Sequence, residues 1–312
     1  MYDMMKKQNF GIEIELTGIT RERAAMVISN FFGTSYRHIG GSYDTYAAKD
    51  RKGRQWKAMS DGSIRTERKS GNQRVAAGHA FSTEVVSPIL QYEDLEDLQN
   101  IVRALRDAGA IANSSCGIHV HVDGANHTGK SLTRLMNFAI GRQDLFYEAL
   151  QIGDRANRWC HKMNRNLFTA MKKDQEKTKG SLERIWYSTL NDGYSGGIDH
   201  AHYNSSRYHG INLHAFFTKG TVEFRLFNGT THAGRIKAYV QFCLAMSAWA
   251  INCEDDDLYF RSIKNYTQER KAKLMNNVLK NRLGLNGREF KTCRQHMTAA
   301  FLPTTEEQNE VA

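Results

Sequence analysis

The 312-residue chain contains no run of eighteen apolar residues, only two prolines and no cysteine pair spaced C-x-x-C. Without such an apolar run, no segment is expected to cross a membrane as a helix. Five scattered cysteines, an odd number, are typical of reduced thiols and argue against a disulfide framework or a cysteine-ligated zinc site. The first residues also lack the apolar core of a signal peptide. We therefore expect a soluble, cytoplasmic protein.

Negative charge is scarce relative to positive charge. The chain has 43 Lys and Arg against 33 Asp and Glu, so its formal net charge is +10. The excess gathers in two basic segments, residues 49–74 and residues 264–297. Such segments suit anionic partners such as nucleic acid or ATP, or they form a solvated surface. No zinc finger, basic zipper or RNP pattern accompanies them, so the sequence favours nucleic-acid binding only weakly.

Alternating and helical patterns predict a mixed order of strands and helices. Strands are expected over residues 9–16, 81–90, 117–122, 210–217 and 221–227. Helices are expected over residues 21–32, from 95 to a stop at 109, and over 130–150 and 232–252. The last two strands are separated only by Thr218, Lys219 and Gly220, which predicts a hairpin and a largely antiparallel sheet.

Two stretches have weaker patterns. Residues 33–80 are rich in Gly, Ser and basic residues and predict hairpins and loops that cover a site, with short strands near 55–59 and 63–66. Residues 153–210 are polar and predict a long functional loop with short helices. We expect one catalytic domain over residues 1–252 that contains both stretches, followed by a basic helical extension over residues 253–312.

Polar side chains fall on one face of four predicted strands, opposite their apolar residues, because residues i and i+2 of a strand share a face. These polar residues are Glu13, Glu15, Glu84, His119, His121, Glu223 and Arg225. Carboxylates that face one another repel unless a cation lies between them. A solvated sheet face would alternate Lys and Thr with Glu, whereas lysine is nearly absent here. If these faces meet, they form a cleft for divalent cations.

The ligand types limit the choice of metal. Oxygen-rich sets favour Mg²⁺ or Mn²⁺, and one imidazole suits Mn²⁺ without excluding Mg²⁺. Zinc is less favoured because the acids outnumber the histidines.

A competing motif follows directly. Gly124–Ser131 reads G-x-x-x-x-G-K-S, the spacing of a phosphate-binding P-loop, between a predicted strand and a predicted helix. Against it, the preceding strand is polar on one face, and no later apolar strand ends in a magnesium-binding Asp. The other interpretation is that Thr128 caps a helix and Lys130 lies in solvent. A P-loop nucleotide-binding protein remains an alternative.

Five segments resemble the amidoligase family in order and type: FGIEIEL, SDGSI, STEVVSPIL, GIHVHVD and SRYHGINL with TVEFRLFNGT. The resemblance covers roughly residues 9–250. That family is similar to glutamate–cysteine ligase and glutamine synthetase, the carboxylate–amine ligases. The resemblance implies an α+β fold in which a largely antiparallel sheet curves into a partial barrel, with helices packed outside. It also implies that the concave face binds ATP and two or three Mg²⁺.

The resemblance implies a reaction and roles for single residues. The γ-phosphoryl group of ATP would pass to a substrate carboxylate, and an amine would attack the resulting acyl phosphate. The implied metal ligands are Glu13, Glu15, Glu84 and Glu223, joined by His121 or His119. Arg225 would neutralise the transferring phosphoryl group. Asp61 and Ser63 would meet the acceptor. Arg207 and Asn212 would face nucleotide or substrate.

The implied partners are a carboxylate and an amine, which a peptide or protein could carry, and an ammonia-supplying amidotransferase. A second hypothesis is a metal-dependent nuclease or phosphoesterase, because clustered acids also bind two metals beside nucleic acid. A third is a protein that binds anions without catalysis. The sequence leaves these open.

Overall fold

One large antiparallel sheet organises the molecule. The computed structural model of the chain describes residues 2–190, 197–255 and 262–302. Eight strands pair in the order β2-β3-β4-β7-β1-β8-β10-β9. They are β1 (Phe10–Leu16), β2 (Tyr36–Gly40), β3 (Thr45–Lys49), β4 (Gln55–Met59), β7 (Thr83–Val86), β8 (Gly117–Asp123), β9 (Ile211–Asn212) and β10 (Thr221–Asn228). A separate hairpin joins β5 (Glu67–Ser70) and β6 (Gln73–Ala76).

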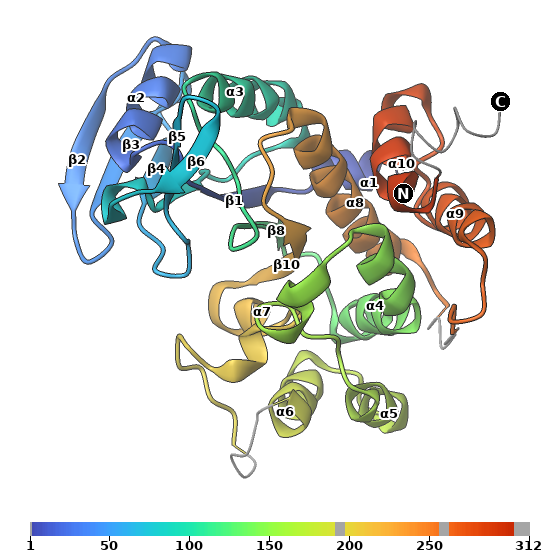
Figure 1. The fold of residues 1–312 in the computed structure, drawn as a ribbon. Coiled ribbons are helices and arrows are strands. Elements are labelled where there is room, and N and C mark those ends of the chain that lie inside the picture. Colours follow the sequence, from blue (N-terminus) through green and yellow to red (C-terminus); the bar gives the residue numbers. More distant parts are fainter. Residues whose placement is uncertain (1, 191–196, 256–261, 303–312) are drawn as a thin grey trace, which may run out of the picture.

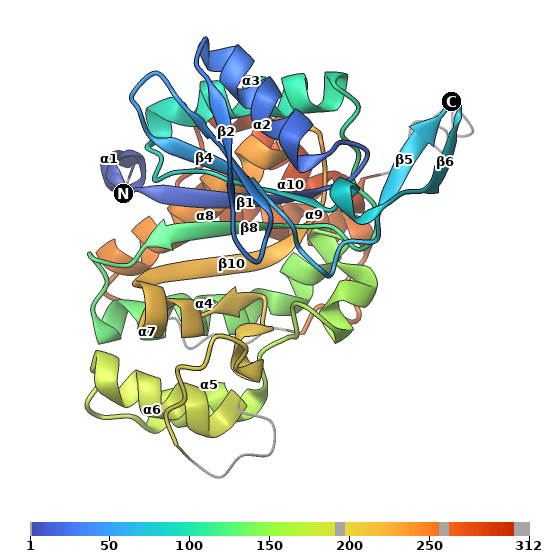
Figure 2. The same ribbon diagram turned by 90° about the vertical axis from the view of Figure 1, so that its left-hand side faces the viewer.

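Helices cover one face of this sheet (Figures 1 and 2). α2 packs against β3 and β4, and α8 packs against β8, with α3 and α4 beside these helices. The helices are α1 (Tyr2–Lys7), α2 (Arg21–Phe32), α3 (Leu95–Asp107), α4 (Gly129–Ala149), α5 (Arg165–Lys173), α6 (Lys179–Leu190), α7 (His214–Lys219), α8 (Ala233–Asn252), α9 (Gln268–Asn277) and α10 (Lys291–Thr298).

The strand period of two explains why α2, α3, α4 and α8 gather on one face of the sheet. Along β1, Ile12 and Ile14 are each 1% exposed and belong to the core beneath the helices. The intervening Glu13 and Glu15 point to the opposite face. The same alternation holds in β8, where Val120 is fully buried in the core. One face of the sheet therefore forms the core, and the other carries polar side chains.

Local signals set the helix ends as predicted. At α2, the Thr20 side chain accepts a hydrogen bond from the backbone N–H of Arg23, and Gly33 ends the helix in the left-handed conformation at φ 68°. α4 begins after Thr128 with a reciprocal capping box to Ser131. These caps agree with the helices expected over 21–32 and 130–150.

The helices of the C-terminal segment pack away from the polar face of the sheet. α10 contacts α8 and α9, which lie on the helical side of the molecule (Figure 1). Within the ranges described above, no helix combines the length and apolarity needed to cross a membrane.

The predicted large antiparallel sheet with helices packed on it is confirmed. The sheet is open, with β2 and β9 as its edges, and it does not close into a barrel, although the strands near β2 run at a clear angle to β1 (Figure 2). Two other expectations about the fold were wrong in detail. Residues 63–66 do not form the predicted short strand. The strands that follow in this part of the chain, β5 and β6, form a hairpin. Of residues 210–217, only Ile211–Asn212 are extended. From Leu213, which has helical dihedral angles, the chain enters α7, and Gly220 ends that helix at φ 76°.

The segments with weak patterns also have structure. Residues 33–80 supply β2, β3 and β4 to the main sheet, besides the β5–β6 hairpin. Residues 153–210 contain α5 and α6, joined by irregular chain. The division into a domain over 1–252 and an extension over 253–312 stays a prediction.

We expect the apolar face of β1 to dominate stability. Ile14→Ala should lower the free energy of unfolding by about 3 kcal/mol, because it leaves a cavity between sheet and helices. Ile89→Ala, at a side chain that is 70% exposed, should change it by less than about 0.5 kcal/mol. Urea unfolding followed by circular dichroism measures both variants, and equal effects would contradict this assignment of the core.

Candidate active site

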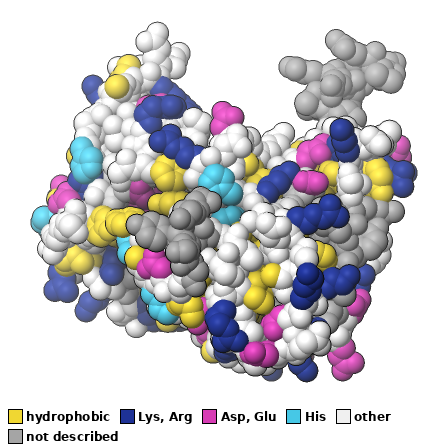
Figure 3. All heavy atoms as spheres, turned by 90° about the horizontal axis from the view of Figure 1, so that it is seen from below, with side chains coloured by type: hydrophobic (Ala, Val, Ile, Leu, Met, Phe, Trp, Pro, Cys, Tyr) yellow, Lys and Arg dark blue, Asp and Glu magenta, His cyan; other side chains and the backbone are white. Residues whose placement is uncertain are grey.

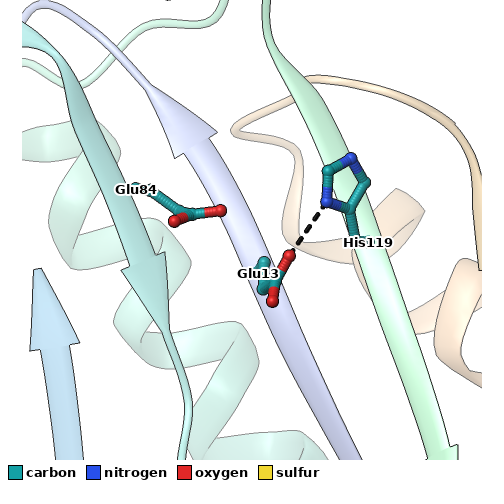
Figure 4. Close-up of side chains that lie close together, drawn as sticks. All are labelled: Glu13, Glu84 and His119. Carbon is teal, nitrogen blue, oxygen red and sulfur yellow. Dashed lines mark hydrogen bonds and ion pairs between the residues drawn. The ribbon is translucent and has the colours of Figure 1, made fainter. Parts of the chain in front are cut away.

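The central strands bring the predicted polar residues together on the open face of the sheet. In the antiparallel register, Glu13 of β1 lies opposite His119 of β8, and Glu223 of β10 lies opposite His121. On the other side of β1, Glu15 lies opposite Glu84 of β7. Figure 4 shows Glu84, Glu13 and His119 projecting from three neighbouring strands toward the same space. Four strands that are far apart in the chain thus share one site.

Glu13 lies at the centre of this group. Its Oε2 is 2.9 Å from Nδ1 of His119 (Figure 4), and its Oε1 is 3.2 Å from Nε2 of His121. Glu223 Oε1 lies 3.7 Å from Nδ1 of His119 and 3.9 Å from Nε2 of His121. The two imidazoles therefore lie between two carboxylates.

Hydrogen bonds hold the carboxylates of Glu223 and Glu15 in place. Arg225 donates from Nη1 to Glu223 Oε1 at 2.6 Å, and Asn212 donates from Nδ2 to Glu223 Oε2 at 2.6 Å. Glu15 accepts a hydrogen bond from the backbone N–H of Gly117 at 2.6 Å. All three side chains, Glu15, Glu223 and Arg225, are nearly inaccessible to solvent. The site is thus a buried, largely preformed charge cluster.

The neighbours of each acid decide its protonation. Burial would raise the pKa of Glu223, but Arg225 and the imidazoles outweigh it and lower that pKa to about 2. Burial also opposes ionisation of Glu13, yet His121 and His119 hold its pKa well below its ordinary value. Glu84 makes no ion pair with any residue that the structure describes. Burial and the charges of Glu13 and Glu15 outweigh the opposing effect of Arg225 and raise the pKa of Glu84 well above its ordinary value. One part of the cluster therefore lacks positive charge.

Three groups of side chains have ligand atoms close enough to hold a cation. Within each group, the atoms lie within 4.8 Å of one another. The groups are Glu13, Glu84 and His119; Glu13, His121 and Glu223; and Glu15, Asp61 and Glu84. The buried Nε2 of His119 makes no hydrogen bond among the described residues and lies 3.7 Å from Oε1 of Glu15. This oxygen-rich set with imidazole nitrogens is compatible with Mg²⁺ or Mn²⁺, and the identity of the metal stays a prediction.

A cleft of about 470 Å³ lies over the cluster. Its lining includes Glu13, Glu15, Glu84, His119 and Arg225, together with the predicted residues Asp61, Ser63 and Arg207. Asp61 follows β4 and accepts a hydrogen bond from the backbone N–H of Ser63 at 2.6 Å, so these two residues form one turn at the wall. Asp61 therefore lies beside the cluster, within the third group of ligand atoms.

Arg207 and Asn212 lie together beside the cleft. Both line a smaller cavity of about 230 Å³, which Glu223 also borders. Arg207 donates to the carbonyl of His202 at 2.7 Å. Asn212 is 1% exposed, and its side chain donates a hydrogen bond to Glu223. It therefore orients this carboxylate.

A sequence model of a family described as "Putative amidoligase enzyme" matches residues 6–247. The chain belongs to this amidoligase family. The match includes every strand of the main sheet and hence the whole cluster. The family's name assigns an amide-forming ligase. No curated protein sequence matches the chain.

Several lining residues in this amidoligase were missed in the sequence. Lys57 of β4 and Lys219 at the end of α7 border the cleft, and Arg155 and Trp159 border it from the segment after α4. Lys57 could have been found, because it alternates with the buried Trp56 and Ala58 in β4. Lys219 was interpreted as a turn residue, and no pattern in residues 153–210 marked Arg155.

The structure does not favour phosphate binding by Gly124–Ser131. A Cβ added at Gly129 would lie 2.3 Å from the backbone of Lys177, so this loop is covered by another segment. The hydroxyl of Ser131 accepts from the backbone N–H of Thr128 at 2.8 Å and lies 3.0 Å from Nδ1 of His127. The loop is a helix cap, as the other interpretation of the sequence predicted.

Glu84→Gln should stabilise the protein in EDTA. Because the folded-state pKa of Glu84 is raised, ionisation at neutral pH opposes folding. The amide should therefore raise the free energy of unfolding by about 1 kcal/mol or more at pH 7.5. The gain should vanish below about pH 4, where this carboxyl is neutral in both states. Thermal unfolding from pH 4 to 8, with exposed Glu96→Gln as control, measures it; destabilisation at pH 7.5 would contradict the assignment.

Proposed function

We propose that the protein is an ATP- and Mg²⁺-dependent carboxylate–amine ligase that forms an amide through an acyl phosphate. The observation that carries this proposal is the set of three overlapping ligand groups, which share Glu13 and Glu84. Two of the groups lie wholly in the lining of the cleft, and the third joins it through Glu13, while its His121 and Glu223 border the adjoining cavities. The open antiparallel sheet with its polar face is compatible with the expected likeness to glutamine synthetase and glutamate–cysteine ligase. That likeness is part of the proposal.

The three ligand groups would hold two or three Mg²⁺. Bound there, Mg²⁺ would neutralise phosphate oxygens and orient the transferring group. Two electrostatic properties of the site affect the binding of such ions. Glu84 lacks a compensating charge, and His121 has a raised pKa because Glu13 and Glu223 outweigh the effect of burial. A proton on His121 would compete with a cation, so metal affinity should fall as the pH falls.

Cationic side chains at the cleft suit the phosphates of ATP. Arg225 is held in place by Glu223 and by the carbonyl of Trp159, to which its Nε donates at 3.4 Å. Lys57 and Lys219 make no ion pair with any residue that the structure describes, so their ammonium groups are available to anions. Phosphoryl transfer needs mainly such positioning and charge neutralisation.

The proposed reaction has two steps. A carboxylate oxygen of the acid attacks the γ-phosphorus, and ADP leaves. The amine nitrogen then attacks the carbonyl carbon of the acyl phosphate, the C–O bond breaks and inorganic phosphate leaves. The amine must lose a proton as the C–N bond forms. Asp61, on the turn at the cleft wall, would accept that proton.

An acyl phosphate must be protected from water. Two segments far apart in the sequence meet at the cleft: the hydroxyls of Tyr43, between β2 and β3, and Tyr203 lie 3.4 Å apart. Both tyrosines line the cleft. This contact supports the expectation that residues 33–80 and 153–210 cover the reacting groups.

The nuclease hypothesis gains no support. Of the lining residues of the cleft and its neighbouring cavities, none comes from residues 264–297. In the other basic segment, Lys52 and Arg54 both form ion pairs with Asp94, and Lys52 also pairs with Glu93. On the face drawn in Figure 3, Lys and Arg lie in separate groups mixed with Asp and Glu rather than in one band. A continuous groove for nucleic acid is therefore not favoured.

Turnover tests the proposed function. Purified protein with ATP and Mg²⁺ should release ADP and phosphate only when an acid and an amine are both supplied. Glu15→Gln, His121→Ala and Arg225→Ala should each lower kcat/KM at least about 100-fold, as loss of a charged transition-state contact does elsewhere. Cleavage of nucleic acid without ATP, abolished by the same variants, would instead support the nuclease.

A pair of lysines distinguishes the cleft from the P-loop-like motif. Lys130→Ala should change kcat/KM by less than about twofold, because this loop is a helix cap. Lys219→Ala, which removes an unpaired charge at the cleft, should lower it by about tenfold. The reverse ranking, with both variants folded by circular dichroism, would show that Gly124–Ser131 binds the nucleotide.

A further inference from the structure

A larger cavity of about 900 Å³ adjoins the acidic cleft, and we call it the arginine pocket. The residues common to both walls are Gly62, Ser63, Ser115, Arg155 and Trp159. Its charged lining residues are Arg65, Arg155, Arg158 and Asp154. Arg65 is compensated by Glu67, whose Oε1 lies 3.1 Å from its Nε. The pocket thus carries an excess of positive charge next to a cluster of negative charge.

Arg155 is a buried cation without a counter-ion. It is 6% exposed, and its Nη1 donates to the backbone carbonyl of Phe227. Its buried Nε has no hydrogen-bond partner, and no carboxylate of the described residues forms an ion pair with it. Burying an unpaired guanidinium is costly, and guanidinium groups bind carboxylates through two parallel hydrogen bonds. The side chain is therefore suited to an anionic ligand.

The surrounding chain fixes this guanidinium beside the metal-ligand cluster. A Cβ added at Gly117 would lie 2.3 Å from Nη2 of Arg155, so the guanidinium packs directly on this glycine. The N–H of the same glycine donates to Glu15. The carbonyl of Arg155 accepts from the backbone N–H of Trp159 at 2.9 Å, and the carbonyl of Trp159 accepts from Arg225. Arg155 is thus connected through short contacts to both Glu15 and Arg225.

Two of the amide side chains that line the pocket, those of Asn113 and Asn228, already make hydrogen bonds. Asn113 Oδ1 accepts from the backbone N–H and the hydroxyl of Ser115 at 3.0 and 2.6 Å, and Asn228 donates to the carbonyl of Gln151 at 2.8 Å. These contacts hold the loops that form the wall. Arg155 lines the pocket with Nη1 bonded to the Phe227 carbonyl and without a carboxylate partner among the described residues, and the exposed Arg158 lines it as well. Their positive charge is therefore available to an anionic ligand.

We propose that the arginine pocket binds a second carboxylate of the acid substrate while the first carboxylate lies in the acidic cleft. This inference rests on the proposed function and names its substrate class: a dicarboxylic acid, either free or as the acidic end of a peptide. A monocarboxylic acid would leave Arg155 unpaired. The volume of the pocket, within the range of cavities that hold sizeable ligands, leaves room for a peptide.

Calorimetric titration of the full chain with matched acids tests the proposal without catalysis. Glutarate and pentanoate have the same chain length and differ by one carboxylate; a tripeptide ending in glutamate and its glutamine counterpart test the peptide source. The wild type should bind the dicarboxylic member of a pair at least about tenfold more tightly. Arg155→Gln should abolish this preference, whereas Arg103→Gln, on the exposed face of α3, should retain it.

No preference in the wild type, or a full preference in folded Arg155→Gln, would overturn the proposal. If Arg155→Gln does not fold, Arg155→Lys decides. Lysine retains the charge and a donor for Phe227 but cannot bind a carboxylate through two parallel hydrogen bonds, so the preference should fall several-fold. An unchanged preference in that variant would equally contradict the proposal.

Turnover with the same acids separates this inference from the proposed function. ADP released equally with glutarate and pentanoate would leave the ligase intact and overturn the arginine pocket. A preference for glutarate that depends on Arg155, without ADP release from any acid and amine, would retain the pocket and overturn the ligase.

Discussion

Repulsion among buried carboxylates is the constraint on which this site depends. Glu13, Glu15, Glu84 and Glu223 point into the same space, where burial makes each negative charge costly. His119, His121 and Arg225 offset most of that repulsion around Glu13 and Glu223 but not around Glu84. In the account proposed here, divalent cations supply the missing positive charge and attract the phosphates. The same imbalance that costs stability would thus create the affinity for metal and nucleotide.

The alternation of the strands joins the core and the site in one pattern. Ile12 and Ile14 of β1 pack beneath the helices, while Glu13 and Glu15 line the cleft. A shift of one residue in strand pairing would exchange the two faces, so the apolar core also fixes the register of the charged groups. The helices pack on the apolar face of the sheet and hold it rigid. Residues from 33–80 and 153–210 complete the wall of the cleft.

Periodicity and capping predicted much of this arrangement from the sequence. Strand alternation placed Glu13, His119 and Glu223 each on the polar face of its own strand, and the antiparallel register of the structure brings these faces together. The limits have physical causes. α7 begins at His214, although the residues before it alternate like a strand. Gly220 ends this helix, but a glycine at that position is equally typical of a hairpin turn, so it could not distinguish the two. A bulge between Phe224 and Phe227 interrupts the register, and the Phe227 carbonyl accepts from Arg155. Such irregular contacts leave no periodic signal, and the roles assigned to the site residues stay predictions.

Binding of Mn²⁺ to the nucleotide-free protein tests the central claim most directly, because it requires neither substrate nor turnover. Electron paramagnetic resonance of free Mn²⁺ during titration at pH 7.5 gives the number and affinity of the bound ions. The account predicts two or three bound ions that Mg²⁺ displaces, and loss of at least one with Glu13→Gln, which removes a ligand common to two groups. No bound Mn²⁺, or the same number in Glu13→Gln, would contradict it.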